Sequence, residues 1–102
     1  MMMGIARSVT KMLPMCYHSA MKPETQEWVR RAVEDLAVAE LALKEACVAS
    51  SLFHCQQAIE KLLKGVWIER IEGVPPRTHD LVHLAERLAL SLSEAQFEFL
   101  RL

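Results

Sequence analysis

The stretch from Leu52 to Val66, which reads LFHCQQAIEKLLKGV, decides the fold of this chain. Its apolar residues recur at alternating spacings of three and four, the pattern of a helix that packs lengthwise against its neighbours. The seam comprises Leu52, Cys55, Ile59, Leu62 and Val66. This pattern predicts a long helix that ends before Gly73, since Pro75 and Pro76 then require an extended connection.

A second long helix is predicted upstream, from about Thr25 to Ala46. Its apolar residues also recur every three or four positions, which gives one side of an amphipathic helix: Trp28, Val29, Ala32, Val33, Leu36, Ala39 and Leu43. Glu40 falls inside this apolar arc, where a carboxylate needs a lysine or histidine partner or a position at a dimer seam. The small residues 47–51 are either a short connection or a weak point in one helix, with Ser50 or Ser51 as a cap.

Two shorter helices are predicted in the last third of the chain. Thr78 can cap a third helix that has Asp80 in its first turn, and Ser93 followed by Gln96 has the spacing of a capping box. The fourth helix is cut off at Leu102. We therefore expect an all-α fold, an antiparallel up-and-down helical bundle of four or so helices with a truncated C-terminal element.

Composition limits the classes of function. The 102 residues suffice for one domain, and the net charge of −1 gives no global attraction for phosphate backbones, so nucleic-acid binding would need a local basic patch. No apolar run approaches the roughly 18 residues that span a bilayer, so a membrane role is not expected. Cys16, Cys47 and Cys55 have no metal-type spacing, which indicates reduced thiols in a cytoplasmic protein.

The chain divides into two parts, residues 1–23 and residues 24–102. The first part contains Arg7 and Lys11 but no acidic residue, and it has no stripe of helical period. We interpret it as an N-terminal tail, either disordered or an upstream extension, and hypothesise that Met21 is the natural start. The second part forms the helical bundle.

Three segments in order resemble the HEPN domains (higher eukaryotes and prokaryotes nucleotide-binding). They are Arg31–Leu36 with its Glu-Asp-Leu, Phe53–Lys64 with the sequence FHCQQAIEKLLK, and Pro76–Leu81 with the sequence PRTHDL. The resemblance covers about residues 25–92. It implies a helical bundle that forms a homodimer and is paired with a nucleotidyltransferase, often as toxin and antitoxin.

The function that this resemblance implies is a nucleotide- or RNA-associated binding or regulatory module. Many HEPN proteins are metal-independent endoribonucleases with an Arg followed four to six residues later by a His. This chain lacks that spacing, because Arg77 is two residues before His79 and Arg101 has no histidine after it. Whether the chain is an enzyme stays open; the alternatives are an endoribonuclease toxin and a structural assembly module without ligand.

The candidate residues for binding a nucleotide or RNA are Gln57, Lys61, Lys64, Arg77, His79 and Asp80. Cationic donors among them can hold a phosphate, and His79 is the candidate catalytic residue because an imidazole can shuttle a proton. The competing structural reading has Thr78 and Asp80 satisfying backbone donors at a helix start and His79 tied to Glu60.

Other polar and aromatic residues favour packing over chemistry. His79 and His83 are four apart, but two histidines alone do not make a metal site, and we expect neither a metal nor another cofactor. Trp28 and Trp67 lie beside apolar stripes, which favours a role in packing over base stacking. Cys55 lies on the buried seam, where a thiol is usually inert.

Overall fold

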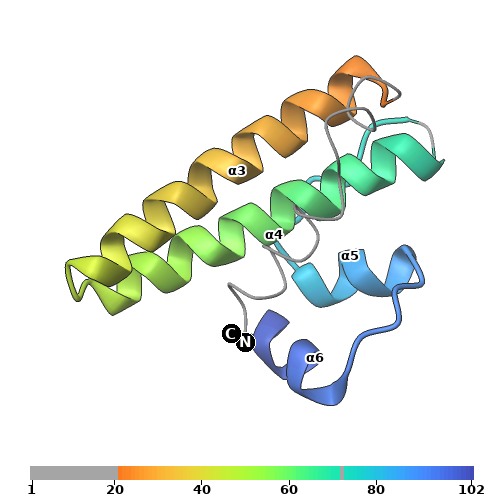
Figure 1. Cartoon of the computed structure of the whole chain (residues 1–102). Helices are drawn as coiled ribbons and strands as arrows, with labels where there is room; N and C mark the ends of the chain where they lie inside the picture. Colours follow the sequence, from red (N-terminus) through yellow and green to blue (C-terminus); the bar gives the residue numbers. More distant parts are fainter. Residues whose placement is uncertain (1–20, 72) are drawn as a thin grey trace.

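The structure is a computed structural model that describes residues 21–71 and 73–102. The described part contains the helices α3 (Pro23–Lys44), α4 (Val48–Ile71), α5 (Leu81–Arg87) and α6 (Glu94–Leu100), and no strand (Figure 1). The predicted all-α bundle is confirmed. Most of the predicted tail lies outside the described residues. No described helix is long and apolar enough to cross a membrane.

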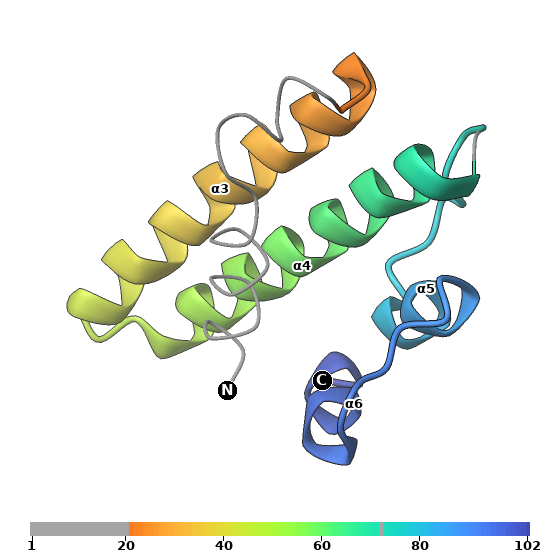
Figure 2. The ribbon, with the colours of Figure 1, turned by 45° about the vertical axis from the view of Figure 1, so that its right-hand side comes forward.

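The long helices α3 and α4 form an antiparallel hairpin and lie side by side along their length (Figures 1 and 2). The short helices α5 and α6 are placed along α4 on its side away from α3. The central helix α4 is therefore covered on two sides. This arrangement explains why its buried residues exceed the single predicted seam and include Leu63 and Trp67 as well as Cys55 and Leu62.

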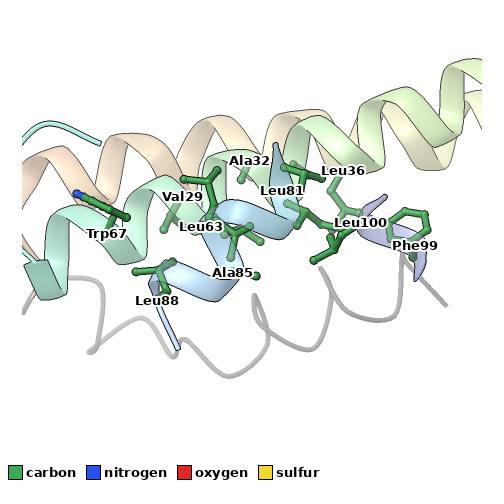
Figure 3. Close-up of a cluster of buried hydrophobic side chains, with 14 of the residues drawn as sticks. Val29, Ala32, Leu36, Leu63, Trp67, Leu81, Ala85, Leu88, Phe99 and Leu100 are labelled. Atoms are coloured by element: carbon green, nitrogen blue, oxygen red, sulfur yellow. The ribbon is translucent and has the colours of Figure 1, made fainter. Parts of the chain in front are cut away.

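The core brings together apolar residues from all four of these helices (Figure 3). Val29 and Leu36 come from α3, and Leu63 and Trp67 come from α4. The short helices α5 and α6, with the residue that caps α5, contribute Leu81, Leu84, Ala85, Leu88, Phe99 and Leu100. Burial of large apolar side chains such as these stabilises a fold by roughly 1.5–3 kcal/mol each. The packing role predicted for Trp67 is confirmed.

Both α3 and α5 end in the same hydrogen-bonded motif. After α3, Ala46 has a φ of 59°, its N–H donates to the carbonyl of Leu43 at 3.0 Å, and the N–H of Cys47 donates to the carbonyl of Ala42 at 2.8 Å. These are the two bonds of a Schellman motif, which satisfies the last carbonyls of a helix. The left-handed residue ends α3 at Lys44, two residues before the predicted end.

Two predicted caps are wrong, and the reasons are local. Ser51 lies inside α4 and is buried against α3, where its hydroxyl donates to the carbonyl of Ala39 at 2.8 Å. Asp80, not Thr78, is the N-cap of α5 and accepts from the N–H of His83 at 3.0 Å. Thr78 instead accepts from the N–H of Asp80. The capping box of Ser93 and Gln96 is confirmed.

The close approach of α3 and α4 requires a small residue at Gly65. A Cβ atom built there would lie 3.3 Å from the Cβ of Trp28, which is tighter than ordinary van der Waals contact. Arg31 and Lys64 lie over the Trp28 ring, with their cationic groups 5.5 and 5.8 Å from its centroid. Trp28 is therefore engaged in the packing of the hairpin, as predicted.

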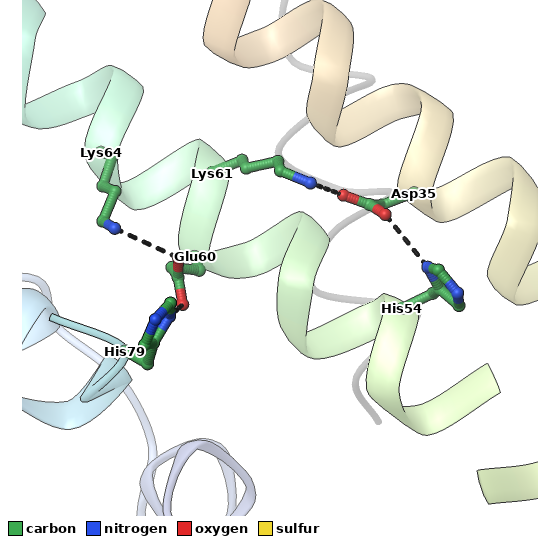
Figure 4. A network of polar contacts seen from close by, with 6 residues as sticks. All are labelled: Asp35, His54, Glu60, Lys61, Lys64 and His79. Carbon is green, nitrogen blue, oxygen red and sulfur yellow. Dashed lines mark hydrogen bonds and ion pairs between the residues drawn. The ribbon is translucent and has the colours of Figure 1, made fainter. Parts of the chain in front are cut away.

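Polar contacts also join α3 to α4 (Figure 4). The carboxylate of Asp35 accepts from Lys61 through one oxygen and lies 3.0 Å from Nδ1 of His54 through the other. Partial burial alone would raise the pKa of Asp35, but the hydrogen bonds and positive charges of Lys61 and His54 outweigh it and lower that pKa. Asp35 is thus held ionised in the folded state.

Replacing Ala46 by glycine should stabilise the protein. A left-handed conformation costs an L-residue with a side chain roughly 1–2 kcal/mol relative to glycine, so Ala46→Gly should raise the free energy of unfolding by about 1 kcal/mol in urea denaturation. Ala37→Gly, an exposed substitution inside α3, is the matched control and should lower it by roughly 0.5–1 kcal/mol. A loss of stability in both variants would contradict the assignment.

Asp35→Asn should destabilise the protein in a pH-dependent way. The folded state lowers the pKa of Asp35. The contribution of the ionised carboxylate to the free energy of unfolding is therefore fully present above the ordinary pKa of 3.8, and it is lost as the pH falls through the lowered pKa of the folded state. We expect a cost of about 2 kcal/mol at pH 7, which shrinks below about pH 4. Glu34→Gln, at an exposed position of α3, should cost less than about 0.5 kcal/mol; an equal, pH-independent cost for both variants would refute the prediction.

Candidate functional site

Glu60 is a carboxylate on the central helix with only 6 % of its surface exposed. Such a group needs partners, because an ionised carboxylate is expensive to remove from water. Its Oε1 lies 2.8 Å from Nδ1 of His79, and its Oε2 accepts from Nζ of Lys64 at 3.2 Å (Figure 4). The predicted tie between His79 and Glu60 is confirmed.

The contact with Glu60 positions the His79 ring. Nδ1 is engaged by the carboxylate, while the side chain of His79 remains 85 % exposed. The second ring nitrogen, Nε2, is thereby left for a ligand. Tethering of one imidazole nitrogen by a carboxylate is an arrangement that orients the other for proton transfer or hydrogen bonding.

A groove of about 530 Å³ lies beside this contact, between α4 and the C-terminal part of the chain. That volume is within the range of pockets that hold small organic ligands. Its lining combines polar and apolar residues: Phe53, Gln56, Gln57, Glu60, His79, Asp80, Leu81, Val82, Leu100, Arg101 and Leu102. The groove can therefore offer both an apolar wall and hydrogen-bonding groups to one ligand.

The structure brings three of the six candidate residues together. Gln57, His79 and Asp80 line the groove. Lys61 is engaged by Asp35 at the hairpin interface, and Lys64, only 8 % exposed, is engaged by Glu60. Arg77 is exposed in the connection between α4 and α5 and is not part of the groove lining.

Sequence reasoning missed Phe53, Gln56 and Arg101 as groove residues. Arg101 lies beyond α6 and reaches the same groove as His79, although the two are too far apart in sequence, and in the wrong order, for the ribonuclease spacing. Its guanidinium also bonds Glu98 at 2.9 Å, an exposed pair. The capping box of Ser93 and Gln96 indicates where α6 begins, but it does not indicate which residues Arg101 meets.

The described residues support neither a metal site nor a reactive Cys55 thiol. Within residues 21–71 and 73–102, no group of three or more His, Cys, Asp or Glu side chains could hold a metal ion. The thiol of Cys55 is buried, and burial together with the charge of Glu40 raises its pKa. A protonated, buried thiol is a poor nucleophile, as the sequence predicted.

The buried pair of Glu60 and Lys64 should show strong energetic coupling. Lys64→Met should destabilise the protein by about 3 kcal/mol, because it leaves a buried carboxylate with His79 as its remaining partner. Combining it with Glu60→Gln should cost clearly less than the sum of the two single changes, since no uncompensated charge remains. Urea denaturation of the four proteins gives this cycle, and additive costs would show that the pair is not coupled.

Comparison with known proteins supports the architecture. A family model described as HEPN domain matches residues 25–102. The protein named "Putative toxin MJ1304" of Methanocaldococcus jannaschii is 40% identical over 52 residues, which cover 51% of this chain and 33% of that protein. The similarity thus spans about a third of the length of that relative. No solved structure matches the chain.

The family match includes the whole of the described helical bundle from Thr25 onward, and with it the contact of Glu60 with His79 and the groove lining. Since the matching model covers well over half of the sequence, this chain belongs to the HEPN domain family.

Proposed function

We propose that this chain is a toxin-like HEPN module that binds a nucleotide or RNA in the groove beside Glu60 and acts with a nucleotidyltransferase partner in a toxin–antitoxin-type pair. The observation that carries the proposal is the groove lining. It combines a positioned imidazole, a guanidinium and two amides in a volume suited to a nucleotide. The similarity to a protein named as a toxin supports the toxin-like role.

Arg101 and His79 are the groups that would meet a phosphate. An arginine fork and an imidazole are both donors suited to phosphate oxygens. Because Lys61 and Lys64 are bound to Asp35 and Glu60, they serve the fold and leave this role to Arg101. The protein as a whole has a net charge of −1, so binding depends on these local donors, and with so few phosphate contacts the affinity should fall only modestly as salt is raised.

RNA cleavage is a second candidate, favoured by the presence of His79 and Arg101 in one groove. In such a reaction His79 would remove the proton of a 2′-hydroxyl, whose oxygen attacks the adjacent phosphorus to form a 2′,3′-cyclic phosphate. The bond to the 5′-oxygen breaks, and that oxygen leaves with a proton from water, while Arg101 neutralises the charge that develops on the phosphate. No metal ion is needed for this chemistry. Incubation of labelled RNA with the protein and with His79→Ala tests it directly.

The proposed homodimer and the partner protein need an interaction surface. Several large apolar side chains of α3 and α4 are exposed near the hairpin turn, among them Val38, Leu41, Val48 and Leu52. Where such side chains gather on a small protein, they favour a site of association. We assign the homodimer to this region, and expect the mass in solution to be twice that of the chain.

Thermal unfolding against a panel of nucleotides and short RNAs tests the proposed function. A ligand at ten times its Kd stabilises the folded state by about 1.4 kcal/mol, which for a domain of this size raises the midpoint by about 5–10 °C. The shift should vanish in Arg101→Ala and His79→Ala. Arg30→Ala, which removes an exposed arginine of α3 outside the groove, is the matched control and should keep it.

A folded protein whose midpoint no nucleotide or RNA changes would refute the binding proposal. In that case the chain would be an assembly module, and the light-scattering mass of the same sample would show whether it assembles with itself. A shift that survives Arg101→Ala would place the ligand elsewhere on the protein.

A further inference from the structure

Phe53 is an aromatic side chain that the packing of the bundle does not use. It lies on α4, lines the groove and is 55 % exposed. Its aromatic contact among the described residues is edge-type, with the His54 ring at a centroid distance of 5.2 Å and an interplanar angle of 80°. A contact of this kind leaves a ring face for a flat partner, and base-on-aromatic stacking is a common way to hold single-stranded nucleic acid.

The polar side of the same groove has the groups that read the edge of a base. Gln56 and Gln57 are half-buried, and neither side-chain amide forms a hydrogen bond with another described residue. A glutamine amide presents a donor and an acceptor side by side, which matches the amino group and ring nitrogen of adenine. Single-stranded RNA is typically recognised by this combination of stacking and edge reading.

Asp80 adds a hydrogen-bond acceptor that distinguishes one base from another. One of its oxygens accepts from the N–H of His83, and the other has no partner among the described residues. This oxygen is an acceptor only, so the part of the groove next to Asp80 favours a base that brings an N–H group. Uracil has a carbonyl oxygen where the exocyclic amino group would lie, and that oxygen would face the Asp80 carboxylate unfavourably.

We propose that Phe53 stacks on a base of single-stranded RNA and that Gln57 and Asp80 select a base with an exocyclic amino group, adenine being bound most tightly. This inference rests on the proposed function, because it uses Arg101 and His79 to hold the neighbouring phosphate. Val82 and Leu100, on the apolar part of the lining, limit the access of water to the stacked base.

The test is a competition measured by fluorescence anisotropy. A labelled hexa-adenylate binds the full chain at fixed salt, and three unlabelled hexamers compete: adenylate, uridylate and an abasic ribose-phosphate of equal charge. Hexa-adenylate should compete at least tenfold better than hexa-uridylate, with the abasic strand weakest. Gln57→Leu should bring the ratio of adenylate to uridylate affinity toward one.

Phe53 is tested with matched variants. Phe53→Leu should weaken hexa-adenylate about tenfold, within the range expected for loss of one stacked base, and should leave the abasic strand unaffected. Phe53→Trp keeps the stacking surface and should bind at least as well as the parent. Val33→Ala, which shortens an exposed side chain of α3 outside both the groove and the proposed homodimer surface, is the control and should not change the affinity.

The outcomes separate the two proposals. Equal competition by all three hexamers, with Phe53→Leu binding like the parent, would overturn base recognition and leave a phosphate-binding groove in place. Failure of every hexamer to bind the folded parent would overturn the proposed function and base recognition together. A tenfold loss in Phe53→Leu that Phe53→Trp does not show would support stacking.

Discussion

The ion pair of a buried carboxylate organises the C-terminal third of this protein. Glu60 lies on the side of α4 that faces away from α3, where the short helices cover it, and an isolated charge there would cost several kcal/mol. Lys64, one turn further on, supplies one partner, but the second comes from His79 in the connection before α5. Because Glu60 needs this second partner, the connection before α5 passes back beside α4 at His79. That segment forms one wall of the groove.

The walls of the groove differ in how firmly they are held. α4 is packed along its length against α3, with Ser51 and Asp35 adding polar contacts across the interface. The opposite wall depends on two helices of seven residues each and on the contact of His79 with Glu60. Segments with few buried contacts open most readily, and binding sites are drawn from them. A ligand that joins the two walls would therefore stabilise the less firmly held part of the molecule.

Local patterns in the sequence predict the positions of the helices well. They predict contacts between residues far apart in the sequence poorly. The apolar periods located α3 and α4, and the capping box of Ser93 located α6, because these patterns depend on neighbours within one or two turns. The sequence offers Ser50 or Ser51 as a cap because nothing local shows that Ser51 faces the carbonyl of Ala39. The sequence does not indicate Arg101 for the same reason, since its approach to the groove of His79 depends on how α5 and α6 fold back.

The stretch FHCQQAIEKLLK shows how one helix combines the two tasks of folding and recognition. Ala58, Leu62 and Leu63 pack in the core. Glu60, Lys61 and Lys64 form ion pairs within the protein. The positively charged residues of this stretch are thus poor candidates for ligand binding, although their charge makes them the obvious choice in a sequence. What remains for a ligand is Phe53 and the two glutamines, which are uncharged. A groove that reads a ligand with uncharged groups and acceptors discriminates by shape and hydrogen bonding more than by charge, and this fits a protein with nearly balanced charge.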